Sequence, residues 1–502
     1  MKSKEILLKK ALSLFVLLGP FVDMLTSVAV QFGISSLTVG IAVRFCFVAA
    51  ISLYVLFMYR GPQRNLFRLA ILITSVYGVV FLVSTVYING FGVLVENVKM
   101  FFKTYFFIYV LLGILALYKE YKILISDKIL TIVFCMYTAS ILLAVVTGTS
   151  FYTYYWQQIG YCGWFYAGNE IGAIIAILSG VAMLYGFAHN KYLWIGILGL
   201  LAFSCTHIGT KVPFLGIIAI AVILTVFWFI KAVASRSKRA VNMVLKCLAL
   251  IVCIVLLYHM NSPVKQLNAQ ANDRYEGIVD AIDTQVSVAT VGSNETLVDM
   301  TEAPEATEQT EVSEAIEETE VSEATEQIGA PDWTEETPQQ ETPITNQDDA
   351  ISSDKEIKSD KIYAIINWLL SNRLSNIERV IEKYADSSLS EKLLGIGYIF
   401  KVDENWVSDT VEMDFVAIFI KQGIIGFGIY LMPIVIFAVI CIVELLKKLK
   451  SFANLDVVIV YAYGVLIGLA CAFVAGHVLV APAVSIYIAV FIVKLYAYLK
   501  EH

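Results

Sequence analysis

The sequence is poor in the residues from which metal and disulfide sites are built. It contains 8 cysteines and 5 histidines among 502 residues. It has no Cys-x-x-Cys pair and no Cys/His spacing typical of a structural zinc site. All the cysteines except Cys162 lie in or beside apolar runs, which argues against a disulfide-stabilised domain. We therefore expect neither a bound metal nor another cofactor.

The sequence also lacks a basic stripe outside its apolar runs. Its net charge is −7, and the negative excess comes from one acidic segment, residues 293–350. A nucleic-acid-binding domain normally carries Lys and Arg clustered on one face. We therefore expect no nucleic-acid partner.

Apolar residues, by contrast, are abundant. They make up 58% of the chain, whose mean hydropathy is +0.73, whereas soluble domains are about 45–50% apolar. A helix needs roughly 20 apolar residues to cross a lipid bilayer. The apolar runs predict an all-α polytopic membrane protein of about twelve transmembrane helices. The expected spans are 11–32, 36–59, 66–88, 93–118, 127–147, 168–188, 191–208, 212–230, 242–259, 415–444, 455–475 and 478–499.

The basic residues of the short loops predict the orientation, because Lys and Arg are retained on the cytoplasmic side. Basic clusters precede the first span and follow the even-numbered spans. We therefore expect both termini in the cytoplasm and the chain in the plasma membrane. The first span has features of a signal peptide, but Pro20 and Asp23 interrupt its apolar run. It is expected to be an uncleaved anchor.

The spans divide the chain into three parts. Residues 1–260 hold spans one to nine, residues 261–411 form one large extracytoplasmic loop, and residues 412–502 hold spans ten to twelve. Within the loop, residues 293–350 are rich in Glu and Thr with few apolar residues, which predicts a disordered insert. Residues 354–411 carry apolar residues at helical spacing and are expected to be ordered and helical.

Ionisable residues gather at the outer face of the predicted spans. Such groups are costly at membrane depth and usually face a cavity or a partner. Their shared position predicts one extracytoplasmic site for a charged substrate. The candidates are Arg44, Lys99, Lys103, Glu170, Lys211, Arg373, Glu412, Asp414 and His477.

The basic candidates inside spans also have structural interpretations. Arg44 and Glu96 are able to form a buried ion pair. Lys99 and Lys103 lie one helical turn apart, so they either line a phosphate-binding cavity or extend to the membrane surface.

The carboxylates and the histidine have alternatives as well. Glu170 is placed to cap span six, and His477 to bond a backbone carbonyl. Glu412 and Asp414 open span ten, where the helix dipole stabilises carboxylates. The aromatic exterior segment at 151–166 suits stacking on sugar rings or an aromatic belt at the membrane interface.

Five motifs in order resemble the O-antigen ligase and O-antigen polymerase superfamily, in the branch from bacteria with no outer membrane. The likeness covers most of the chain except residues 293–350. The motifs are YAGNEIGAIIAIL, THIGTKVPFLG, NRL…LLGIGY, VEMDF…GIIGFGIYL and AGHVLVAP.

The resemblance implies a GT-C-type membrane glycosyltransferase. Such an enzyme takes a glycan linked to undecaprenyl diphosphate and transfers it to a hydroxyl of a glycan or cell-wall acceptor outside the membrane. The transfer usually inverts the anomeric centre and needs no metal. The product is a polymerised or ligated surface polysaccharide, and the resemblance leaves both outcomes open.

The resemblance also implies roles for individual residues. Arg373 matches the exterior-loop arginine, and Lys211 the basic residue between two spans, that hold the diphosphate in the family. Many ligases carry a histidine before span ten, where this sequence has Glu412 and Asp414, so a carboxylate base is expected. The expected catalytic residues are thus Arg373, Glu412 and Asp414. The expected diphosphate ligands are Arg373, Lys211, Arg44 and Lys103, with His477, Lys99 and Glu170 as further candidates.

Two other functions fit part of the pattern. About twelve spans also suit a transporter or flippase of lipid-linked sugars, although the sequence shows no clear internal repeat and its charges lie toward one face. A metal-dependent site would use oxygen ligands from Asp403, Glu404, Asp409, Glu412 and Asp414, although their spacing matches no EF-hand loop.

Overall fold

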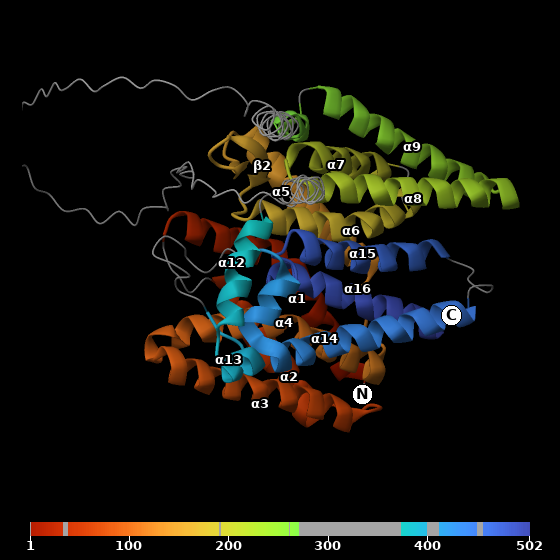
Figure 1. Ribbon diagram of the computed structural model, residues 1–502. Helices are drawn as coiled ribbons and strands as arrows, with labels where there is room; N and C mark the ends of the chain where they lie inside the picture. The colour runs from red at the N-terminus through yellow and green to blue at the C-terminus, as the bar shows by residue number, and fades with distance from the viewer. Residues whose placement is uncertain are drawn as a thin grey trace, which may run out of the picture. The chain divides into compact units, whose positions relative to one another are not determined.

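The computed structural model of the chain is shown in Figure 1. It describes residues 2–33, 39–189, 192–260, 262–270, 373–398, 411–448 and 455–501. The chain divides into two compact units: Met1–Arg274 with Ile366–His502, and Tyr275–Ile365. Every described residue belongs to the first unit. The expected disordered insert at 293–350 and the candidate ligands Asp403, Glu404 and Asp409 therefore lie outside the described residues.

Helices dominate the described residues and confirm the expected all-α membrane architecture. Their bounds are α1 (Lys2–Gln31), α2 (Val39–Leu53), α3 (Arg64–Asn89), α4 (Leu94–Tyr121), α5 (Asp127–Val146), α6 (Gly168–His189), α7 (Leu193–His207), α8 (Lys211–Ser235), α9 (Lys238–His259), α12 (Arg373–Ala385), α13 (Leu389–Leu394), α14 (Asp414–Lys448), α15 (Leu455–Val474) and α16 (Pro482–Glu501). A π-helical turn, Tyr54–Met58, extends α2, and a 3-10 turn, Phe91–Val93, precedes α4.

The helices agree closely with the expected spans. Of the described helices, 11 are long and apolar enough to cross a membrane. The remaining expected span corresponds to α7, an apolar helix of only 15 residues. Figure 1 places both chain ends toward the same end of the helices.

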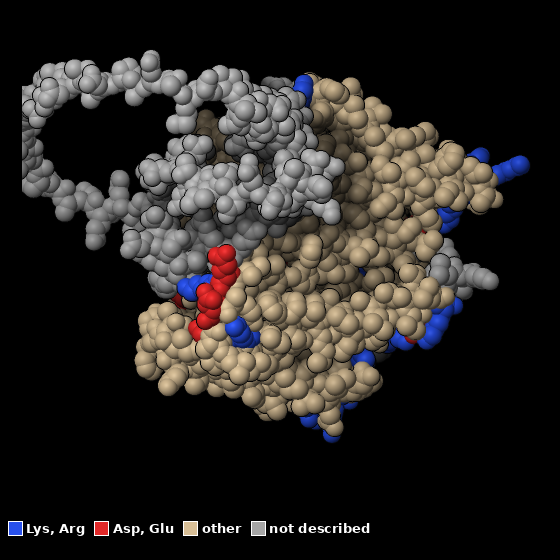
Figure 2. Space-filling model, viewed as in Figure 1, with Lys and Arg blue, Asp and Glu red and all other residues tan. Residues whose placement is uncertain are grey.

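The inner layer of the bundle consists of α4, α6 and α16. Their most apolar windows are 72%, 83% and 83% buried, against 22% for α1 and 17% for α14. The outer helices present apolar side chains such as Val79 and Val83 of α3, which are 63% and 64% exposed. Over the face in Figure 2, Lys and Arg gather mainly near helix ends and leave the helix sides largely uncharged. Such sides suit contact with lipid tails.

A short hairpin interrupts the helical pattern between α5 and α6. Strands β1 (Phe151–Tyr154) and β2 (Ile159–Gly163) pair antiparallel, with Tyr152 opposite Tyr161. The Thr153 hydroxyl donates a 2.5 Å hydrogen bond to the Ile208 carbonyl. This bond fixes the aromatic segment at 151–166 against the α7–α8 connection.

Helix α14 is broken near its beginning. Gly423 adopts a φ of 65°, which is outside the helical region and favours glycine. The carbonyls of Ile420 and Lys421 instead accept hydrogen bonds from the backbone N–H groups of Ile396 and Gly397, at 3.3 and 3.1 Å. The break therefore gives Lys421 a direction that a continuous helix would not.

Candidate functional site

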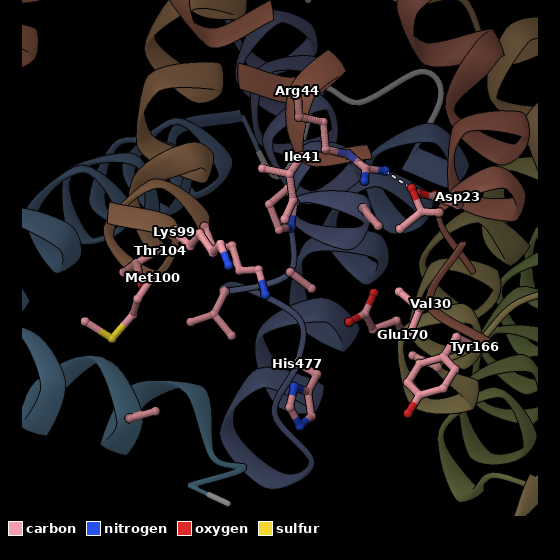
Figure 3. A pocket seen from close by; sticks show the side chains of 18 of the residues that line it. Asp23, Val30, Ile41, Arg44, Lys99, Met100, Thr104, Tyr166, Glu170 and His477 are labelled. Carbon is pink, nitrogen blue, oxygen red and sulfur yellow. Dashed lines mark hydrogen bonds and ion pairs between the residues drawn. The ribbon is translucent and has the colours of Figure 1, made fainter. Parts of the chain in front are cut away.

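A cavity of about 680 Å³ lies among α1, α2, α4, α6, α14 and the turn before α16. Figure 3 shows side chains from these different elements directed toward one space. Its polar lining residues are Asp23, Thr26, Ser27, Arg44, Glu96, Lys99, Lys103, Thr104, Tyr166, Glu170, Tyr398, Lys421 and His477. Five sequence candidates thus come together here from widely separated parts of the chain: Arg44, Lys99, Lys103, Glu170 and His477.

Two of the basic side chains are neutralised by ion pairs. Arg44 pairs with Asp23 of α1, whose other carboxylate oxygen accepts a 2.6 Å hydrogen bond from Tyr137. Lys99 pairs with Glu96, one turn earlier on α4, at 2.8 Å. The expected pair of Arg44 with Glu96 is therefore replaced, because Asp23 reaches Arg44 across the α1–α2 contact. Asp23 is only 7% exposed, so this pairing stabilises an otherwise costly buried charge.

Three other groups of the cavity have no such neutralising partner. Within the described part of the chain, no hydrogen bond or ion pair involves the side chains of Lys103, Glu170 or His477. Figure 3 shows Glu170 and His477 facing the same open space. The carboxylate of Glu170 interacts electrostatically with His477, Lys103 and Arg44, and is opposed by Asp23. A carboxylate and basic groups are thus available to a ligand.

Glu170 owes its position to the start of α6. This helix begins at Gly168, so Glu170 lies within the first turn. Negative charge is stabilised there by the helix dipole. The capping role considered from the sequence is therefore only electrostatic, and the carboxylate itself lines the cavity.

Asp414 lies beside the cavity rather than on its surface. Its side chain is 1% exposed, and its carboxylate accepts hydrogen bonds from the backbone N–H groups of His477, Val478 and Leu479 at 2.8, 2.8 and 2.6 Å. These bonds hold the turn between α15 and α16, in which His477 has a φ of 55°. Asp414 therefore supports the position of His477, instead of presenting a base to the cavity.

The remaining sequence candidates do not line the cavity in the described residues. Glu412 is half-buried just before α14, and Lys211 is exposed at the first position of α8. Neither is among the cavity-lining residues. The backbone of Arg373 begins α12, and its side chain lies outside what the structure describes. No group of His, Cys, Asp or Glu suited to a metal ion occurs among the described residues.

Several lining residues escaped the sequence argument. Asp23 was noted only as an interruption of the first span, although a lone carboxylate in an apolar run is itself a signal of a polar partner. Lys421 carried the same signal in span ten, followed two residues later by Gly423. Tyr166 ends the aromatic segment and Tyr398 ends the LLGIGY motif that the sequence singled out, but both lie in connections, where hydropathy does not indicate which way a side chain points.

A family model described as "O-antigen ligase like membrane protein" matches residues 5–502. No curated protein and no solved structure matches the chain. The match extends over the cavity and over every helix that contributes to it.

Proposed function

Because this chain belongs to the O-antigen ligase-like family of membrane proteins, we propose that it is a glycosyltransferase of surface-polysaccharide assembly. Its donor would be a glycan on undecaprenyl diphosphate, and its acceptor a hydroxyl of a second glycan or of the cell wall. The observation that supports this chemistry is one cavity lined by the carboxylate of Glu170 together with the basic side chains of Lys103 and His477, none of which forms a hydrogen bond or ion pair among the described residues. Family membership by itself supports a membrane enzyme of polysaccharide assembly.

In the proposed reaction, Glu170 is the general base. Its carboxylate takes the proton of the acceptor hydroxyl as that oxygen attacks the anomeric carbon of the donor. The bond between the anomeric carbon and the diphosphate oxygen breaks, and the diphosphate leaves with the electron pair. A single displacement of this kind inverts the anomeric centre.

The leaving diphosphate requires positive charge where its own negative charge develops. Lys103 supplies that charge directly, and His477 supplies a hydrogen-bond donor. Arg44 contributes less, because Asp23 already neutralises it. Arg373 and Lys211 stay in the proposal as the diphosphate ligands that the family resemblance implies, since a diphosphate-linked glycan extends beyond the cavity.

We propose further that the cavity opens to the outside of the plasma membrane and that both termini are cytoplasmic. Lys and Arg concentrate in the connections at the opposite helix ends, as between α8 and α9, where Arg236, Lys238 and Arg239 occur. Retention of such residues in the cytoplasm supports this orientation.

The test uses protein purified in detergent and a radiolabelled lipid-diphosphate glycan as donor. Turnover without a second compartment is expected, and it would separate the transferase from a flippase. Glu170→Gln should lower kcat by about 10²–10⁴-fold, as loss of a general base does. Glu412→Gln is the matched comparison, since Glu412 is a carboxylate at the same end of the bundle that does not line the cavity.

The outcomes separate the candidates for the base. Loss of turnover in Glu412→Gln with full turnover in Glu170→Gln would transfer the role to Glu412. Full turnover in both variants would reject a carboxylate base at either position. No turnover by the wild-type chain, with transport of the same donor in vesicles, would replace the transferase by the flippase.

A further inference from the structure

A second cavity lies at the other end of α6 from the first. Its volume is also about 680 Å³, and it is lined by residues of α5, α6 and α7. Glu170 is in the first turn of α6 and His189 is its last residue, so 19 residue steps, or about 28 Å of helix, separate these two lining residues. The ion pair of Lys494 with Asp127, at 2.9 Å, holds the beginning of α5 against α16. We call this second cavity the α5–α7 cleft.

One end of the α5–α7 cleft is polar and basic. Lys128 and His189 are exposed lining residues, and no ion pair neutralises either of them in the part of the chain that the structure describes. The Nδ1 atom of His189 lies 3.1 Å from the carbonyl oxygen of Tyr185. That contact assigns the proton to Nδ1, so the imidazolium form would present a second donor, Nε2–H.

A buried hydroxyl in the cleft is left without a partner. Thr131 is 3% exposed, and its Oγ1 makes no hydrogen bond. Threonines elsewhere in these helices behave differently: Thr138, also on α5, donates to the carbonyl of Phe134 at 2.9 Å. A buried polar atom without a partner is unfavourable and calls for an explanation. Because Thr131 also lines the cleft, a bound ligand would supply the missing partner.

The rest of the cleft is apolar. Ile132, Cys135, Met136 and Ala139 line it at helical spacing along one face of α5. The lining thus changes from basic to apolar along a helix that is long enough to cross the membrane. A free inorganic anion would use only the basic end of this surface.

We propose that the α5–α7 cleft is a binding site for one anionic glycerophospholipid. The phosphate would lie between Lys128 and His189, the Thr131 hydroxyl would donate to a phosphate or ester oxygen, and an acyl chain would follow Ile132 to Ala139. Basic pockets between membrane helices attract anionic headgroups, and the unpartnered hydroxyl indicates an oxygen-rich ligand. This site is separate from the proposed glycan-transfer cavity.

The site is tested by native mass spectrometry of the full chain, exchanged into detergent with equal amounts of phosphatidylglycerol and phosphatidylcholine. We expect the wild type to retain one phosphatidylglycerol in preference to phosphatidylcholine. Lys128→Gln with His189→Gln should reduce that retention on the order of tenfold, since each basic group contributes to anionic-lipid affinity. Thr131→Val, which keeps the shape of the side chain, should reduce it less.

Lys238→Gln is the matched control. Lys238 is an exposed lysine that also begins a membrane helix, and it is not a lining residue of the cleft, so its removal should leave retention unchanged. Elution as a single monodisperse peak establishes that a variant is folded. If the double variant fails this criterion, phosphatidylglycerol retention is compared with the wild type in the two single variants Thr131→Val and Lys128→Gln instead.

Three outcomes would overturn the proposal. Equal retention of both lipids by the wild type would show an apolar groove without headgroup recognition. Unchanged retention in the cleft variants would place the lipid elsewhere. Competition by inorganic phosphate as effective as that by phosphatidylglycerol would make the ligand a free anion. Because none of these measurements uses glycan transfer, failure of the proposed function would leave this result interpretable.

Discussion

Asp414 and His477 are 63 residues apart in the sequence, and the carboxylate of the first binds the backbone N–H of the second at 2.8 Å. Two more N–H groups of the same turn donate to that carboxylate. His477 also has a positive φ, a conformation that non-glycine residues adopt only when the surroundings impose it. Asp414 is therefore a positioning residue, and its removal should displace the imidazole of His477.

Asp414→Ala should destabilise the protein by about 1–3 kcal/mol, because buried N–H donors lose their acceptor. It should also lower kcat more than it raises KM, since the displaced His477 no longer meets the diphosphate in the transition state. Thermal unfolding and glycan-transfer kinetics measure the two effects. Hydrogen exchange of residues 476–479 should become faster.

Asp456→Asn is the control for Asp414. Asp456 is 6% exposed in the first turn of α15, and its Oδ1 makes no hydrogen bond. Its substitution should leave exchange in the 476–479 turn unchanged. Equal exchange of that turn in Asp414→Ala and the wild type would show that the turn does not depend on Asp414.

Lys103→Ala should lower kcat by about 10²–10³-fold if this ammonium stabilises the leaving diphosphate. Lys103→Arg, which keeps the positive charge, should recover part of the loss. Lys99→Ala should have a smaller effect, because the ammonium of Lys99 is already held 2.8 Å from Glu96. Comparable losses in Lys99→Ala and Lys103→Ala would contradict the distinction between a paired and an unpaired lysine.

Gly423→Ala should be destabilising, because a φ of 65° with a ψ of 180° is a conformation essentially restricted to glycine and costs another residue on the order of 1–3 kcal/mol. A Cβ at this position would also press on the backbone of Leu393 and Gly395. Gly428→Ala is the control on the same helix, since a Cβ there has open space. That variant should be neutral or slightly stabilising. Similar melting temperatures for the two variants would mean that the break in α14 does not form.

Cys162 should resist alkylation in the folded protein. Its side chain is fully buried in β2, and burial raises the pKa of the thiol to about 12. The reactive thiolate is therefore almost absent at pH 8. Because the folded pKa is higher than the unfolded value of 9.0, this group's contribution to stability is full below pH 9 and declines as the pH rises toward 12.

Maleimide labelling followed by mass spectrometry of the peptide containing Cys162 measures this. A Tyr155→Cys variant is the comparison, since Tyr155 is 68% exposed in the connection between the two strands, and its thiol should be modified rapidly. Rapid modification of Cys162 at pH 8 under native conditions would contradict the burial of this side chain in β2.

The membrane spans were predictable because a bilayer imposes one simple requirement on them. Each span must be long and apolar, and its backbone N–H and C=O groups must bond to one another within the helix. Hydropathy therefore locates each span within a few residues. The break at Gly423 was not predictable in this way. A window average over IFIKQGIIGFG hides the fact that two carbonyls are bonded by Ile396 and Gly397, from before the start of the helix.

The sequence predicted which residues belong to the site better than it predicted which carboxylate pairs with which cation. The cost of charge in lipid identified Arg44, Lys103, Glu170 and His477 as outer-face residues, and the structure brings all four to one cavity. Which carboxylate meets which cation depends on the rotation of each helix about its axis. For the same reason, the sequence did not distinguish the buried Asp414 from a carboxylate that faces the cavity.

The break in α14 has a mechanical consequence. Residues 414–422 are attached by backbone hydrogen bonds to the strand-like segment at 396–397, and Tyr77 binds the carbonyls of Leu394 and Gln422 at 3.0 and 2.6 Å. This stub of helix is therefore tied by hydrogen bonds to residues 394–397 and to α3. A displacement of residues 394–397 would be transmitted through these hydrogen bonds to Lys421, and so to the charge distribution in the cavity that Lys421 lines.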